Sequence, residues 1–309
     1  MRKLRILPAL LALALVITGC KAPSLPVPNS ANHVDMEQRG DLAVSGTVSG
    51  GEGRWIYRVT TYTVTGEHFA ADDVDHVITR QSYQMPTMSV SRSKGEKELP
   101  AAAARAAEQF NAYFEQVLED EAAWFDEVAA AADEDYGAVG NERGSVWQDR
   151  RFCYWDEATL DFWSNDRILC VTTTRYSFTG GAHPNTWKSG VTFDLRTGKT
   201  VTAADLTDNV AALETAVTQE LVRQAEERMK KPADPATDYV PPTYYDDYAE
   251  TLGAWMDRTV IFGEQGMTVI FGFYDIAPHD AGEQCFLIPY RLLKAYLSDC
   301  GAEALGLRK

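Results

Sequence analysis

The residues best suited to chemistry are two histidines, each in a short loop of the second half of the chain. The first loop contains Gly180, Gly181, His183, Pro184 and Asn185. Paired glycines permit positive φ angles and a close approach of backbone, and the proline stiffens the exit of the loop. This composition fits either a tight corner whose histidine bonds the backbone or a recognition loop that contacts a ligand.

The second loop runs from Asp275 to Gly282, and Tyr274, directly before it, is a further candidate for ligand contact. It contains Asp275, and Pro278 and His279 lie at its tip. A strand-to-strand connection capped by the aspartate would explain these residues. A contact surface would explain them too, because loops on a rigid sheet carry function more often than cores do. We predict that both loops contact a ligand.

Neither histidine by itself predicts catalysis. A general base needs a nucleophile or an acid beside it, and the chain offers no Ser/His/Asp spacing of that kind. It has no Walker loop, GxSxG or HExxH motif. Residues 133–144 begin like a calcium loop but end in Gly144 instead of a bidentate acid. We therefore predict no catalytic residue, metal or cofactor, and keep peptidoglycan hydrolysis or deacetylation by His183 or His279 as an alternative.

A run of tyrosines is a third candidate surface. Residues 232–248 include four prolines, which remove backbone donors and fix φ, so we predict a long irregular excursion there. Tyrosine combines a large contact area with few rotors and a polar tip, which suits a protein interface or a sugar platform. A solvent-exposed insertion is the alternative. The tyrosines concerned are Tyr239, Tyr244, Tyr245 and Tyr248.

The first twenty residues predict the cellular location. Met1 to Arg5 is cationic, Ile6 to Ile17 is apolar apart from one proline, and Ile-Thr-Gly precedes Cys20. This is the pattern of an export signal over residues 1–19, and twelve apolar residues are too few to span a bilayer. The end of the segment resembles a bacterial lipobox, in which Cys20 is lipidated. We expect a protein anchored by lipid to the outer face of the cell membrane; the alternative is an ordinary signal peptide.

Residues 20–53 are rich in proline and glycine and lack apolar periodicity. Such a composition is typical of a flexible linker. We predict that this segment holds the folded part away from the membrane.

Four further cysteines follow. Outside the cytoplasm an even number favours disulfide pairing, and CxxC spacing typical of a metal site is absent. Cys285 opens a predicted strand and Cys300 follows a helix-like run from Arg291 to Ser298. If the helix folds back over the strand, the two sulfurs meet, so we predict a bond between Cys285 and Cys300. Buried free thiols are the alternative.

Composition and charge define the class of protein. Hydrophobic residues make up 45% of the chain and charged residues 24%, which excludes a disordered protein. The formal net charge is −16, and removing Arg2, Lys3 and Arg5 with the signal leaves −19. A strongly anionic globule repels nucleic acid, so we expect no nucleic-acid partner.

Hydrophobic periodicity predicts the elements that position the loops. Steps of three and four predict long helices from Leu99 to about Ala132 and from Asp208, the expected N-cap, to Lys231; a short helix follows at 290–297. Without βαβ alternation, the fold class is α+β, with antiparallel sheets, two long helices packed on one face and a short C-terminal helix. Strands are expected at 54–65, 77–90, 145–156, 159–164, 167–179, 191–195, 199–202, 259–262, 267–274 and 284–288.

Two stretches carry a resemblance to a known family. Residues 176–185 (YSFTGGAHPN), followed by 193–199 (FDLRTGK) and Asp205-Leu206, resemble the C-terminal domain of RsiV-type bacterial extracytoplasmic proteins. Residues 273–284 and 288–290 look like that family's later loop and final strand. The resemblance implies a C-terminal domain over residues 179–309.

The preceding region is similar to the N-terminal domain of PdaC-type peptidoglycan deacetylases. The similarity rests on the strands of 77–90 and on Phe110-Asn111, and it implies a domain over residues 54–178. RsiV-type domains bind lysozyme, whereas the anti-sigma and deacetylase modules of the two families are missing here. The resemblance thus implies a lipid-anchored envelope module that binds a cationic protein such as lysozyme, or peptidoglycan. A purely structural envelope protein is a further alternative.

Overall fold

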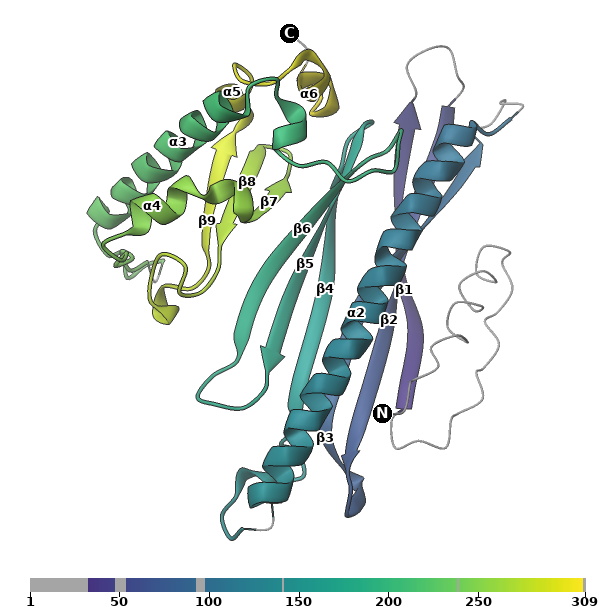
Figure 1. Cartoon of the computed structure of the whole chain (residues 1–309), viewed down its shortest axis with the longest axis vertical. Coiled ribbons are helices and arrows are strands. Elements are labelled where there is room, and N and C mark those ends of the chain that lie inside the picture. Colours follow the sequence, from purple (N-terminus) through teal and green to yellow (C-terminus); the bar gives the residue numbers. More distant parts are fainter. Residues whose placement is uncertain (1–32, 48–53, 93–97, 141, 238, 308–309) are drawn as a thin grey trace.

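The computed structural model describes residues 33–47, 54–92, 98–140, 142–237 and 239–307 (Figure 1). Its largest element is a six-stranded sheet whose strands lie side by side in chain order. Neighbouring strands are antiparallel except β3 and β4, which are parallel. The strands are β1 (His33–Thr47), β2 (Arg54–Ala70), β3 (Asp73–Arg92), β4 (Tyr154–Ser164), β5 (Ile168–Phe178) and β6 (Asn185–Asp194).

Helix α2 (Ala101–Val139) makes the crossover that the parallel β3–β4 pair requires. It lies diagonally over one face of the sheet (Figure 1). Apolar residues at helical spacing, including Ala103, Phe110 and Phe114, pack against strand residues such as Trp55. The predicted long amphipathic helix is therefore confirmed and extends seven residues beyond Ala132, to Val139.

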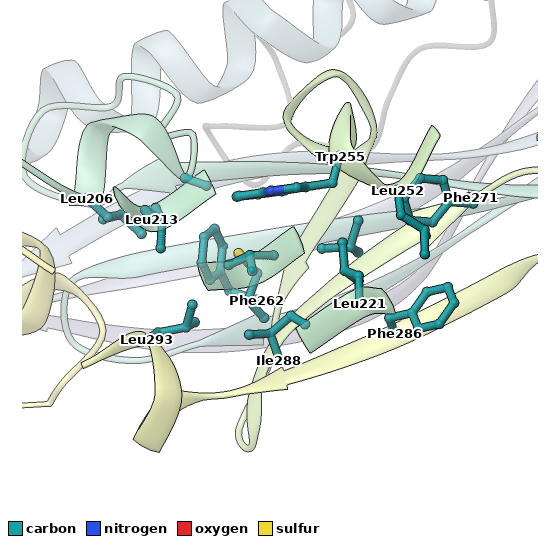
Figure 2. Packing of buried hydrophobic residues seen from close by; sticks show 14 of the residues in the cluster. Leu206, Leu213, Leu221, Leu252, Trp255, Phe262, Phe271, Phe286, Ile288 and Leu293 are labelled. Carbon is teal, nitrogen blue, oxygen red and sulfur yellow. The ribbon is translucent and has the colours of Figure 1, made fainter. Parts of the chain in front are cut away.

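A second, three-stranded antiparallel sheet lies in the C-terminal part of the chain. Helix α3 packs along it, capped by Asn209, not by Asp208 as predicted: the Asn209 side chain accepts a hydrogen bond from the Ala212 amide at 3.1 Å. Leu221, Trp255 and Phe286 lie in the closed core between helices and sheet (Figure 2). The elements are α3 (Val210–Lys230), α4 (Tyr248–Gly253), β7 (Thr259–Phe262), β8 (Gly266–Phe271), β9 (Gln284–Pro289), α5 (Tyr290–Leu293), α6 (Asp299–Ala304) and the 3₁₀ turns η1 (Val146–Gln148), η2 (Ala204–Leu206), η3 (Trp255–Asp257) and η4 (His279–Ala281).

Strand β5 joins the two cores. Ile168 and Cys170 belong to the C-terminal core, whereas Leu169 and Val171 belong to the core beneath α2. Side chains of a strand alternate between its faces, so the two sets point in opposite directions. Both faces of β5 are thus covered, one by α2 and the other by the C-terminal elements.

The predicted α+β class is confirmed. The two long helices, however, cover different sheets: α2 packs on β2, β3 and β4, and α3 packs on β9. Apolar periodicity shows that a helix has one buried face, but it does not identify the sheet that the face covers.

The predicted division of the chain differs from the structure in two places. Residues 33–47 form β1 and pair along β2, although we placed them in the linker 20–53. The prolines of that segment all precede residue 33, so every amide of β1 can join the ladder. The boundary at 178/179 falls between β5 and β6, which pair along their length, so β6 completes the sheet of the preceding region.

Residues 1–19, predicted to be the signal, and Cys20 lie outside the described residues. Within the described ranges, no helix is long and apolar enough to cross a membrane.

The predicted Cys285–Cys300 bond is wrong in this structure, where Cys153, Cys170, Cys285 and Cys300 are free thiols. The prediction needed a helix that returns along the last strand. Helix α5 instead has only four residues, and Cys300 lies in α6, beyond the far end of β9 (Figure 1). Cys285 lies near the start of β9, about 13 Å of extended strand from its end.

We predict that these four thiols are all reactive once the purified chain is unfolded without reductant. Alkylation in denaturant followed by peptide mass spectrometry should find the label on each one, and Cys300→Ser should change the unfolding free energy by less than about 0.5 kcal/mol. A cross-linked peptide containing Cys285 and Cys300 would contradict the structure.

Candidate functional site

The two predicted histidine loops meet. The imidazole rings of His183 and His279 stack with centroids 3.7 Å apart and planes inclined by 29°. The Phe273 ring also stacks on His279, at 4.5 Å and 25°, and Tyr274 lies at 5.6 Å. Two rings can stack on one imidazole at these distances only from opposite faces, so His279 lies between His183 and Phe273. We call His183, Phe273, Tyr274 and His279 the histidine platform.

Tyr274 is the exposed member of the platform and has an unusual backbone. Its side chain is 59% exposed and its φ is +64°, the one positive value of a non-glycine residue in the described chain. Asp275 fixes the turn: its Oδ2 accepts a hydrogen bond from the Gly272 amide at 2.8 Å, and its Oδ1 accepts one from Arg258 Nη1 at 3.1 Å. A strained backbone held by an ion pair at an exposed aromatic residue is typical of a contact site.

The first loop depends on its glycines. Gly180 and Gly181 have φ angles of +91° and +90°. A Cβ atom on Gly180 would lie 2.7 Å from the Tyr154 hydroxyl, whereas one on Gly181 would have no neighbour within 4 Å. His183 Nδ1 lies 3.3 Å from the Pro184 carbonyl oxygen, which accepts a hydrogen bond from it. The loop is therefore a tight corner, as one interpretation held, and it also presents its histidine to the second loop.

Glu283 ties the second loop to β6. Its Oε1 accepts a hydrogen bond from the Lys188 amide at 2.6 Å, and its Oε2 lies 3.9 Å from Lys188 Nζ. Gly282, with φ +67°, turns the chain just before this contact. Pro278 precedes the turn η4, which contains His279, and Asn185 opens β6 beside the first loop.

The platform does not form an acid–base pair. Asp275 accepts from Arg258 and Glu283 accepts from Lys188, and in the described part of the chain neither carboxylate is hydrogen-bonded to His183 or His279. His279 Nε2 is buried and has no hydrogen-bond partner within the described ranges. In those ranges, no group of three or more His, Cys, Asp or Glu side chains is placed to hold a metal ion. The geometry suits contact through stacked rings more than proton transfer.

The tyrosine segment mostly supports the core. Tyr244 is buried and donates to Gln284 Oε1 at 3.0 Å, and Tyr248 stacks on it at 5.4 Å. Tyr239 donates to the Arg228 carbonyl at 2.8 Å. Of the four predicted residues, Tyr245 has the most exposed ring, at 37%. This segment does not converge into one surface.

The structure also contains a polar cluster beneath α2 that we did not predict from the sequence. The Arg175 Nε donates to both carboxylate oxygens of Asp156, at 2.8 and 3.0 Å. Its Nη1 and Nη2 donate to the two Glu121 oxygens at 3.2 and 2.8 Å. The Tyr83 hydroxyl and Trp124 Nε1 each donate to Asp156 Oδ2 at 2.7 Å. We call these five residues the Arg175 cluster.

Burial sets the electrostatics of this cluster. Asp156 is 2% exposed and Tyr83 is fully buried. Burial raises the pKa of Glu121 above its ordinary value, although the Arg175 guanidinium opposes the shift. Burial likewise raises the pKa of Tyr83, which stays a hydroxyl donor. One sign of this cluster is visible in the sequence: Asp156 alternates with Tyr154 and Ala158 along β4. In the structure all three side chains are buried on the same face of the strand.

No family model and no curated protein matches the chain. Solved structures do. The structural neighbours are DUF3298 family proteins.

One neighbour is a DUF3298 family member from Bacteroides fragilis, with a TM-score of 0.50 and 13% identity over 89% of this chain and 99% of that one. A DUF3298 family protein from Pseudomonas aeruginosa aligns with a TM-score of 0.43 and 15% identity over 86% and 95% of the two chains. At such identities, the first neighbour shows a shared fold.

Substituting alanine for either glycine of the first loop tests its geometry. We expect Gly181→Ala to cost about 1–3 kcal/mol, because alanine disfavours its φ. Gly180→Ala should cost more, because the new methyl group also meets the Tyr154 hydroxyl. Urea unfolding of both variants measures the difference, and Gly181→Ala is the control for backbone strain. Equal losses would show that the close approach to Tyr154 is unimportant.

Proposed function

We propose that this chain is a binding module of the bacterial cell envelope, and that the histidine platform is the surface on which it receives a basic protein such as lysozyme. The observation that carries the proposal is the stacking of His183 on His279. It joins two loops, each predicted to bind, into one surface of four rings.

The form of the platform fits protein recognition. Large aromatic side chains with few rotors dominate binding energy at protein interfaces. Three rings of the platform support one another by stacking, so little side-chain entropy remains to be lost on binding. Tyr274 projects beyond them and is the natural anchor residue.

Charge supports a basic partner. The chain has a net charge of −16, and Asp280, next to His279, is exposed. Long-range attraction of this kind raises the association rate and weakens with salt. The resemblance to RsiV-type and PdaC-type domains points the same way, since RsiV-type domains bind lysozyme, and the DUF3298 fold of the structural neighbours is compatible with it.

We expect Tyr274→Ala to weaken lysozyme binding about 30-fold, the loss typical of an anchor residue. The measurement is a calorimetric titration of the full chain at low and at physiological ionic strength, with weaker binding at the higher one. Tyr296→Ala is the control and should bind normally, because this partly exposed tyrosine follows α5 at the end of β9 opposite to the platform. Absence of lysozyme binding at both ionic strengths would refute the proposed function.

A cell-wall glycan is the second candidate ligand, favoured by the exposed Tyr274 ring, since sugars also pack on aromatic faces. Soluble peptidoglycan fragments in the same titration distinguish the two. Binding of the fragments, without lysozyme binding, that is lost in Tyr274→Ala would assign the platform to glycan.

We further propose that Cys20 carries lipid and anchors the module to the outer face of the membrane. Cells expressing the chain with a labelled fatty acid should incorporate label, and Cys20→Ser should abolish incorporation and move the protein to the soluble fraction. A Cys20→Ser protein that still sediments with membranes would contradict this anchor.

A further inference from the structure

A cavity of about 130 Å³ lies beside the Arg175 cluster, between α2 and strands β3–β6. It is distinct from the histidine platform, whose four residues do not line it. Its walls come from the helix and from four strands, β3 to β6. The aromatic and charged side chains and their neighbours on α2 are Tyr113, Phe114, Val117 and Glu121 of α2, Arg175 of β5 and Trp187 of β6.

The cavity is aromatic and partly open. Phe114 is buried, whereas the Tyr113 side chain is 39% exposed at the cavity wall. The Arg175 guanidinium lies 5.4 Å from the centroid of the Trp187 ring, so this ring already serves as a surface for a cation. Tyr113 supplies a further aromatic ring at the cavity wall, and aromatic faces attract cations most strongly where water is partly excluded.

The charges beside the cavity do not balance. Asp156 and Glu121 share Arg175 as their one cationic partner within the cluster, which leaves one surplus negative charge. Among the residues that the structure describes, Arg175 is the only lysine or arginine that lines the cavity. Burial and, after it, the Asp120 carboxylate raise the pKa of Tyr113, so the further charge felt at this wall of the cavity is also negative. Lys188 of β6 is directed to Glu283.

Glu121 is the carboxylate whose negative charge is available to a further cation. Asp156 accepts hydrogen bonds from Arg175, Tyr83 and Trp124, is 2% exposed and does not line the cavity. Glu121 lines the cavity with its side chain 15% exposed, and each of its oxygens has a second lone pair beyond the bond to Arg175. A buried carboxylate with spare acceptor capacity beside aromatic walls is complementary to an organic cation.

We propose that this cavity receives the ammonium or guanidinium head group of a lysine or arginine side chain of the basic partner. The volume suits this occupant, because a cavity of about 150 Å³ holds one benzene molecule, comparable in size to one head group with part of its stem. The inference rests on the proposed function and adds a second contact to it: the platform supplies aromatic anchors, and the cavity selects for a positive side chain.

The test uses the full chain with ¹⁵N-labelled tryptophan and two probes that differ in charge. N-acetyl-lysine methylamide carries the cation, and N-acetyl-norleucine methylamide is its uncharged counterpart, which lacks only the terminal ammonium. We expect the lysine probe to shift the indole N–H signals of Trp187 and Trp124, and the norleucine probe to leave them unchanged. Equal shifts from both probes would overturn the inference, because the cavity would then be merely apolar.

Glu121→Gln should weaken binding of the lysine probe at least about tenfold, because a charge-assisted contact is lost. It should not lower the thermal midpoint, because it removes a surplus buried charge. Glu119→Gln removes an exposed charge from the same helix and is the control; it should bind the probe normally. Should Glu121→Gln fail to fold, Tyr113→Leu removes one aromatic wall at a partly exposed position and should also weaken binding.

Tyr274→Ala distinguishes this inference from the proposed function, since it should leave probe binding unchanged. Lysozyme binding without any shift from the lysine probe would overturn the inference and leave the proposed function standing. Probe binding that Glu121→Gln does not weaken would also overturn it.

Discussion

The burial of β5 on both faces is the constraint on which the rest of the structure depends. Leu169 and Val171 pack under α2, and Ile168 and Cys170 pack into the C-terminal core. The same strand carries Arg175 toward α2 and then runs into Gly180, the glycine that opens the first histidine loop. One strand therefore holds two cores together and positions both candidate contact regions.

The histidine platform exists because the C-terminal elements are fixed against β6. Gly190 allows this contact: a Cβ atom there would lie 3.1 Å from the Val260 carbonyl oxygen of β7. Thr259 donates to the Lys188 carbonyl, and the Lys188 amide donates to Glu283. These bonds set the second loop opposite the first, so the stacking of His183 on His279 follows from strand packing and does not require direct bonds between the loops.

The features that the sequence predicted correctly are those that neighbouring residues in the chain determine. Paired glycines and prolines marked both histidine loops, and apolar periodicity marked α2 and α3. The Arg175 cluster stayed hidden because its members come from α2, β3, β4 and β5, and a lone Glu121 on an acidic helix reads as solvated. The disulfide prediction failed for a related reason. It assumed a helix long enough to return along β9, and the length of α5 is decided by tertiary packing.

Alternation along β6 links the two contact regions. Trp187 faces the cavity beneath α2, and the next residue, Lys188, is held by Glu283 beside the histidine platform. Successive side chains of a strand point to opposite faces, so the two regions lie on either side of one edge strand. A small molecule would occupy one region at a time. A partner that engages both must wrap around this edge, which requires a protein surface with an aromatic-binding patch and a projecting cationic side chain.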